Sequence, residues 1–206
     1  MALVTVSNNS LTAVTALPAS VPTGALTLIK SITASSSASI SFVDGASDVV
    51  FDGTYKSYIF KFIDVHPATD NVYLSFQGNA VGGSGFNETI TSTFFRAGHA
   101  ENDGDTFLSS DASNDQAQGS AFQHITRNIG NGNDECAVGT LQIFAPSDTT
   151  FVKHFIATTQ IYYSGDYSYE TFIAGYINTT SAIDEIQFKM DSGNIDSGII
   201  KLYGVK

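Results

Sequence analysis

The fold class is decided by the stretch Val72-Tyr73-Leu74-Ser75-Phe76-Gln77, in which apolar residues alternate with more polar ones. Successive side chains of a β-strand point to opposite faces, so the first, third and fifth residues share one face. The same period of two recurs over residues 186–190 (Ile-Gln-Phe-Lys-Met) and 200–202 (Ile-Lys-Leu). Each of these segments is therefore predicted to be a strand with one face in a core.

Short apolar runs of this kind alternate with turn residues from Ala25 to the end of the chain. Phe, Tyr, Thr, Ile and Val, which fit a pleated sheet, are plentiful, and no long stripe has the 3.6-residue period of a helix. The pattern predicts an all-β fold, an antiparallel β-sandwich. The predicted strands cover residues 25–32, 38–43, 57–65, 71–77, 88–95, 139–145, 150–163, 168–178, 183–190 and 198–203.

The 206 residues suit a single sandwich domain, which we place at residues 25–206. Within it, the segment from Arg96 to Ile129 is rich in Gly, Asp, Asn and Gln and is too long for an ordinary connection. We expect this segment to be an excursion at one end of the sandwich.

Residues 1–24 differ from the rest, because small residues and two prolines replace the strand pattern. Proline removes ladder donors and favours extended backbone, so we predict an extended N-terminal arm that attaches the protein to a particle. An edge strand of the sandwich, formed around Val4, Val6 and Leu11, is the alternative. The residues expected to make the attachment contacts are Leu11, Val14, Leu17, Pro18, Val21 and Pro22.

The charge balance limits the classes of partner. Twenty Asp and Glu residues against nine Lys and Arg give a formal net charge of −11 at pH 7. A surface of this sign repels phosphate backbones and anionic lipids, so nucleic acid is not expected as a partner.

The N-terminus lacks the features of a signal peptide, and no run is apolar enough for a membrane helix. We therefore expect synthesis in the cytosol, without export or membrane insertion.

Few residues offer metal or redox chemistry. Cys136 is the single cysteine, and the acids of residues 134–135 are expected to raise the pKa of its thiol. The four histidines have none of the spacings of zinc sites, and no cofactor is expected. Calcium is the one metal ion that the sequence leaves open, because residues 101–105 and 131–135 concentrate oxygen ligands.

Catalytic motifs are also missing from the sequence. It contains no nucleophile elbow, no phosphate-binding loop and no dinucleotide fingerprint, so we expect a protein that is not an enzyme. A glycosidase needs two carboxylates that face each other, and spacing along the chain does not test that alternative.

Four tyrosines, Tyr162, Tyr163, Tyr167 and Tyr169, surround the turn signal Ser164-Gly165-Asp166. A tyrosine ring offers a flat apolar face and a hydroxyl, which suits stacking on a sugar or contact with a protein. We take these four residues as candidate contacts to a receptor or glycan. Ordinary cross-strand packing of the rings is the more common arrangement and is the alternative.

Three phrases of the sequence resemble proteins of tailed-bacteriophage particles: residues 58–71 (YIFKFIDVHPATDN), 93–99 (TFFRAGH) and 199–206 (IIKLYGVK). They are similar to phrases in virion structural or tail-fibre-like proteins of marine and cyanobacterial phages, and the likeness runs from about Leu26 to the C-terminus. The resemblance implies a jelly-roll-like body and a place in the virion, assembled in the host cytoplasm. It carries over no catalytic or receptor-contact residues.

We therefore expect a non-enzymatic virion structural protein: a surface appendage, tail fibre or tip that contacts a host receptor. A capsid-decoration or head-fibre protein is the alternative, and a stand-alone carbohydrate-binding or carbohydrate-active protein is the second. Protruding phage proteins usually form closed symmetric oligomers. The expected partners are other virion proteins, further copies of the chain in a homotrimer, and a host-surface glycan or protein.

Overall fold

The computed structural model describes residues 25–206, which form thirteen strands and no helix. No part of this range has a helix of the length and apolarity needed to cross a membrane. The arm predicted for residues 1–24 lies outside the described range and stays a prediction. The strands are β1 (Leu26–Thr33), β2 (Ile40–Val43), β3 (Ser57–Pro67), β4 (Leu74–Ala80), β5 (Ile90–Ala100), β6 (Thr106–Ser110), β7 (Ala117–Gly119), β8 (Gln123–His124), β9 (Ala137–Phe144), β10 (Lys153–Tyr163), β11 (Tyr167–Ile177), β12 (Ile183–Met190) and β13 (Ile195–Val205).

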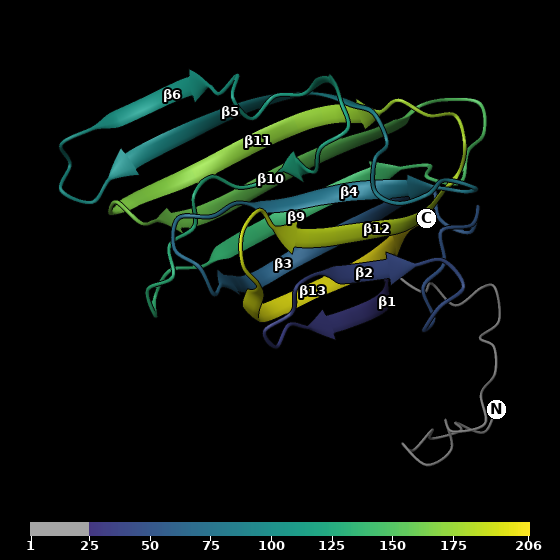
Figure 1. The fold of residues 1–206 in the computed structure, drawn as a ribbon, viewed down its shortest axis with the longest axis horizontal. Helices are drawn as coiled ribbons and strands as arrows, with labels where there is room; N and C mark the ends of the chain where they lie inside the picture. Colours follow the sequence, from purple (N-terminus) through teal and green to yellow (C-terminus); the bar gives the residue numbers. More distant parts are fainter. Residues whose placement is uncertain (1–24) are drawn as a thin grey trace, which may run out of the picture.

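The strands form two sheets that pack face to face (Figure 1). The large sheet has nine strands, in the order β1-β13-β3-β9-β10-β11-β5-β6 with β7 paired to β5. The small sheet has four, in the order β2-β12-β4-β8. All the strand pairings are antiparallel. The structure thus confirms the predicted all-β antiparallel sandwich, and the jelly-roll-like connectivity stays a prediction.

The core lies between the sheets and is built largely from aromatic rings. Phe76 of β4 packs edge-on against Phe155 of β10, with ring centroids 5.0 Å apart. Phe60 of β3 contacts Phe42 at 5.2 Å and Phe188 at 5.0 Å, both from the small sheet. Burial of apolar surface stabilises the fold by about 25 cal/mol per Å², so these rings hold the two sheets together.

Strand β4, which contains most of the stretch that identified the fold, is buried on both faces. Its apolar residues face the core as predicted, but Ser75 and Gln77 on the other face are also buried. The Gln77 side-chain amide donates to the carbonyls of Glu88 (3.0 Å) and Ala121 (3.1 Å). The chain before β8 therefore covers the outer side of β4.

The sequence led us to expect that the segment from Arg96 to Ile129 is an excursion at one end of the sandwich. The structure shows that parts of it belong to the two sheets. It completes β5, adds β6 and β7 to the large sheet, and adds β8 to the small sheet. Ile125 and Ile129 are fully buried in the core. The buried Gln123 accepts a hydrogen bond from the Ser92 hydroxyl at 2.6 Å. Part of the polar composition of this segment comes from buried side chains such as Gln123, and the rest from exposed residues such as those of the β5–β6 turn, residues 101–105.

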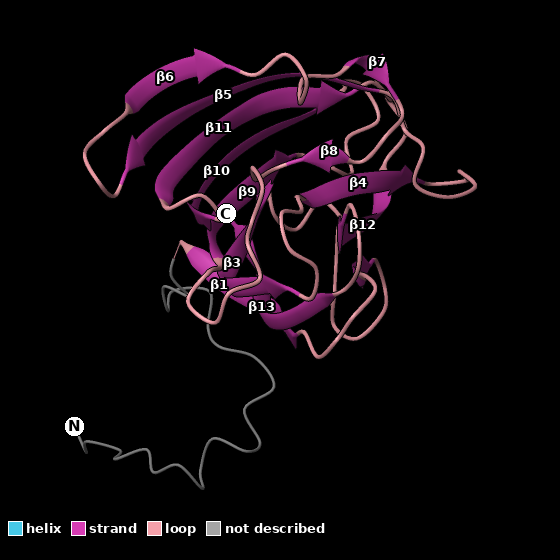
Figure 2. Ribbon diagram, turned by 60° about the vertical axis from the view of Figure 1, so that its left-hand side comes forward, coloured by secondary structure: helices cyan, strands magenta, loops and turns pink. Residues whose placement is uncertain are grey.

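The large sheet is wider than the small sheet, so part of it extends beyond its partner. Strands β2, β12 and β4 lie over β13, β3 and β9, whereas β11, β5 and β6 reach past them (Figures 1 and 2). We call β5, β6 and β11 the overhang. The turns β5–β6 and β10–β11 meet at one end of it, where the Glu101 amide donates to the Asp166 carbonyl at 2.9 Å.

Candidate functional site

The β10–β11 hairpin places the four predicted tyrosines on two faces of the large sheet. In its register Tyr163 pairs with Tyr167, and Tyr162 pairs with Ser168. Because successive residues alternate between faces, Tyr163, Tyr167 and Tyr169 lie on the inner face and Tyr162 lies on the outer face. The four residues therefore do not form a single tip.

The three inner tyrosines form a packed aromatic cluster. The Tyr169 ring stacks on Tyr163 at 4.6 Å and lies 5.4 Å from both Tyr167 and Phe107. Tyr169 is only 6% exposed. The prediction that Tyr169 contacts a receptor or glycan is therefore wrong, because its ring fills space between neighbouring side chains of the overhang. Cross-strand packing, the alternative interpretation, accounts for this residue.

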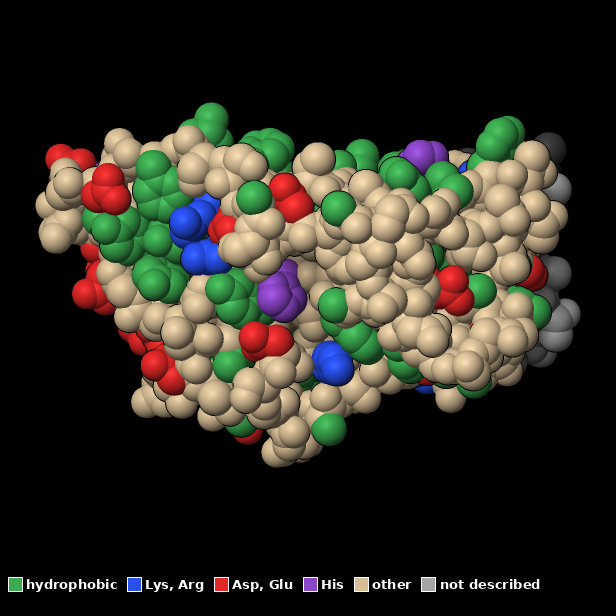
Figure 3. Space-filling model, turned by 45° about the horizontal axis from the view of Figure 1, so that its top comes forward, with side chains coloured by type: hydrophobic (Ala, Val, Ile, Leu, Met, Phe, Trp, Pro, Cys, Tyr) green, Lys and Arg blue, Asp and Glu red, His purple; other side chains and the backbone are tan. Residues whose placement is uncertain are grey.

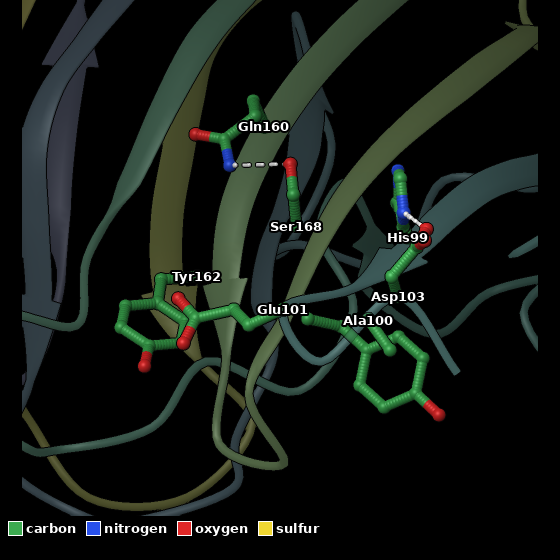
Figure 4. A pocket seen from close by; sticks show the side chains of 8 residues that line it. His99, Ala100, Glu101, Asp103, Gln160, Tyr162 and Ser168 are labelled. Atoms are coloured by element: carbon green, nitrogen blue, oxygen red, sulfur yellow. Dashed lines mark hydrogen bonds and ion pairs between the residues drawn. The ribbon is translucent and has the colours of Figure 1, made fainter. Parts of the chain in front are cut away.

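Tyr162 faces a hollow of about 670 Å³ on the outer side of the hairpin (Figure 4). The β5–β6 turn forms one wall, and the ends of β10 and β11 form the other. The hollow is lined by His99, Ala100, Glu101, Asp103, Gln160, Tyr162, Tyr167 and Ser168.

Polar side chains line the rest of this hollow. The Gln160 amide donates to the Ser168 hydroxyl at 3.4 Å, and His99 Nε2 lies 3.1 Å from Asp103 Oδ1. The Glu101 side chain extends toward the Tyr162 ring (Figure 4). The side chains of His99 and Asp103 are 58% and 91% exposed, so they have room to rearrange around a ligand.

The surroundings of the Tyr162 hydroxyl make loss of its proton harder than in a free tyrosine. Burial, together with the nearby Glu101 and Asp166 carboxylates, raises the pKa of Tyr162 to about 12. The hydroxyl donates to Asp166 Oδ1 at 3.3 Å. The hollow thus combines an aromatic face with hydroxyl, amide and carboxylate groups, and its negative charge disfavours anionic ligands.

The acidic segments that suggested calcium lie beside two separate hollows. Residues 101–105 contribute to the hollow at Tyr162, and residues 133–135 line another beside Cys136. Between residues 25 and 206, no group of three or more His, Cys, Asp or Glu is placed to hold a metal ion. Burial and the Asp64 carboxylate raise the pKa of the Cys136 thiol. The predicted direction is confirmed, but burial is the larger cause and the acid is a different one.

Sequence reasoning missed most of the residues that line the hollow with Tyr162. Gln160 shares a face with Tyr162, because the two lie two positions apart on one strand, so strand alternation offered a signal. The sequence indicated Glu101 and Asp103 only as calcium ligands. His99 gave no signal, because only the pairing of β5 with β11 brings it opposite Ser168.

Comparison of the chain with models of known protein families, with curated proteins and with solved structures found no match. The function of the hollow is therefore argued from its geometry, and the place in a particle expected from the sequence rests on the resemblance described above.

Proposed function

We propose that the protein is a non-enzymatic structural protein of a tailed-phage particle, a surface appendage or fibre tip that contacts a neutral host-surface glycan. The observation that carries the glycan contact is the hollow in which the Tyr162 ring lies beside the Gln160 amide and the Glu101 carboxylate. A sugar has a C–H face that stacks on an aromatic ring, and hydroxyls that bond to amides and carboxylates. The carboxylates of Glu101 and Asp103 favour a neutral saccharide over an anionic one.

The position of the hollow supports a role at the surface of a larger assembly. The hollow is lined by residues of the β5–β6 turn and of the ends of β10 and β11. Figure 1 shows that the β5–β6 and β10–β11 turns lie at one end of the overhang, away from the small sheet. The place in a virion is supported by the resemblance of residues 58–71, 93–99 and 199–206 to phage virion proteins.

The outer face of the large sheet supports association with further copies or with other virion proteins. Cross-strand register aligns Leu28, Tyr203, Ile59 and Ile156 in one row, with Gln142 between the two isoleucines. Leu28 and Ile156 are 52% and 53% exposed. An uncovered apolar row of this kind is typical of a contact surface. It fits the proposed homotrimer, and it also fits the second candidate, a capsid-decoration protein that lies flat on a shell.

The glycan contact is tested by removing the ring from the hollow. We expect Tyr162→Ala to weaken binding of a neutral saccharide, identified on a glycan array, by about 1 to 3 kcal/mol in calorimetry. Tyr176→Ala is the matched control, because Tyr176 lies on the same sheet face at the other end of β11 and outside the hollow. Equal losses in both variants, or no neutral saccharide bound by the wild type, would refute the contact.

The place in the particle needs a separate measurement. Electron microscopy of phage particles labelled with an antibody against residues 25–206 is expected to show label on an appendage. Label over the whole head would favour the capsid-decoration role. The absence of label from the particles would contradict both the appendage role and the capsid-decoration role.

A further inference from the structure

A second group of charged side chains lies on the inner face of the overhang, on the opposite side of the sheet from the hollow. Asp111 Oδ2 lies 2.9 Å from Arg127 Nη1 and 3.4 Å from Arg96 Nε. We call Arg96, Asp111 and Arg127 the arginine cluster. Figure 3 shows a face of the molecule on which basic side chains lie among hydrophobic ones, beside acidic side chains and a histidine.

Aromatic rings flank the arginine cluster on both sides. The Arg96 guanidinium lies over the rings of Phe107 at 5.0 Å and Tyr169 at 5.2 Å. The Arg127 guanidinium lies 5.5 Å from the Tyr73 ring and donates to the Tyr73 hydroxyl at 3.2 Å. These contacts hold both guanidinium groups in place before any ligand arrives.

The charges of the arginine cluster do not balance. Two cations share one carboxylate, which leaves an excess of one positive charge in a chain whose formal charge is −11. The side chains of Arg96, Arg127 and Asp111 are only 21%, 17% and 9% exposed. A partly buried charge without a counterion is costly, so the site favours an added anion.

The guanidinium groups also keep hydrogen-bond donors without acceptors. Within residues 25–206, the bond from Arg127 to Tyr73 is the only hydrogen bond that either group makes. The Nε atoms of both arginines are buried without a partner, and Asp111 Oδ2 is in ionic contact without an aligned hydrogen bond. The terminal N–H groups of Arg96 are therefore free to bind an acceptor from outside.

We propose that the arginine cluster binds the carboxylate of an acidic sugar, of which a uronic acid is the simplest case. A guanidinium pairs with a carboxylate through two parallel hydrogen bonds, and the single charge of a carboxylate cancels the excess charge of the cluster. The half-buried ring of Tyr163, which stacks on Tyr169, provides an apolar face for the sugar ring. A phosphate group would add about two negative charges to an already acidic protein. This site is independent of the hollow at Tyr162.

Calorimetry on the full chain tests the proposal with methyl glucuronide and methyl glucoside, which differ only at the carboxylate. We expect the glucuronide to bind at least about tenfold more tightly, as a charge-assisted hydrogen bond predicts. Arg96→Gln is expected to lower the affinity for the glucuronide by about tenfold or more. Lys56→Gln is the matched control: it removes the same charge at an exposed position before β3 and should leave binding unchanged.

Two further measurements keep the test decisive. If Arg96→Gln does not fold, the wild type is titrated by nuclear magnetic resonance, and the glucuronide is expected to shift the Arg96 and Arg127 Nε–H signals. Inorganic phosphate is titrated in parallel, and phosphate binding as tight as that of the glucuronide would mean a general anion site and overturn the proposal. Equal binding of the glucoside, or signal shifts confined to other residues, would overturn it as well. Tyr162→Ala should leave glucuronide binding intact, so failure here is distinct from failure at the hollow.

Discussion

Single residues set the bend of the large sheet where β3 and β13 lose register. Gly198 has a φ of 114° and Asp64 a φ of 50°, and the pairing of the two strands shifts on both sides of Ser197. A Cβ at position 198 would lie 2.6 Å from both the Asp64 carbonyl oxygen and the Val65 Cα. A bulge of this kind bends and twists a strand. The absence of a side chain at Gly198 is therefore what allows the two strands to stay in contact through the bend.

We expect Gly198→Ala to lower the free energy of unfolding by about 1 to 3 kcal/mol, because alanine is strained at this φ and meets backbone atoms. Gly53→Ala is the control, since nothing lies within 4 Å of the added Cβ. That variant should stay within about 0.5 kcal/mol of the wild type. Urea denaturation compares the two, and equal stabilities would show that the bend accepts a side chain.

At the scale of elements, the segment between β6 and β9 is held by side-chain hydrogen bonds more than by strand ladders. The Gln123 amide donates to the carbonyls of Asn114 (3.0 Å) and His124 (2.9 Å). The hydroxyls of Thr159 and Thr171, on β10 and β11, both lie against the Ile125 carbonyl, at 2.6 and 3.1 Å. The threonine bonds, together with the bond from the Ser92 hydroxyl of β5 to Gln123, fix the segment to the large sheet, and with it Asp111 and Arg127 of the arginine cluster. The two Gln123 amide bonds join parts of the segment to each other.

Gln123→Leu tests this anchoring. The change keeps the volume but leaves buried carbonyl groups and the Ser92 hydroxyl without their partner, so we expect a loss of about 1 to 3 kcal/mol in unfolding free energy. Limited proteolysis should then cut the chain first between residues 111 and 122. Gln160→Leu, at an exposed position, should have little effect on either measurement. An unchanged proteolysis pattern in Gln123→Leu would mean that the segment is held elsewhere.

At the scale of the whole molecule, two partly buried groups make stability depend on pH. Burial lowers the pKa of His124, although the Asp191 carboxylate opposes the effect. Burial alone would raise the pKa of Asp111, but the Ser113 hydroxyl and the Arg127 charge outweigh it, and the pKa is lowered. In both cases the unfolded chain takes up the proton first, so stability falls as the pH drops, below about 6.5 for His124 and below about 4 for Asp111.

We expect His124→Gln to reduce the loss of stability between pH 7 and pH 5, because glutamine does not titrate in this range. Thermal unfolding measured across these pH values gives the slope for each variant. His99→Gln is the control, since the His99 side chain is 58% exposed and makes no buried contact. A slope that is unchanged in His124→Gln would show that protonation of His124 does not couple to unfolding.

How much could be read from the sequence depends on whether the feature is local. The alternation over residues 57–65 and 183–190 predicted β3 and β12 well, because one buried face leaves a period of two in the chain itself. Strands β6, β7 and β8 were missed because they are short and leave no alternation of buried apolar residues: β6 and β7 are largely exposed, and the buried Gln123 of β8 is a polar residue that bonds to Ser92 of β5. The acidic charge of the chain and its single cysteine are likewise properties of composition alone.

The site was decided by tertiary structure. The sequence placed Tyr162, Tyr163, Tyr167 and Tyr169 around one turn, but the register of β10 and β11 separated them onto two faces. Tyr162 and Glu101 line one hollow, and Arg96 and Arg127 both contact Asp111. Both arrangements depend on which strands become neighbours in the large sheet and on how far this sheet extends past the small sheet. Alternation is a property of each strand, whereas strand order results from contacts between residues far apart in the chain, and a single sequence does not display those contacts.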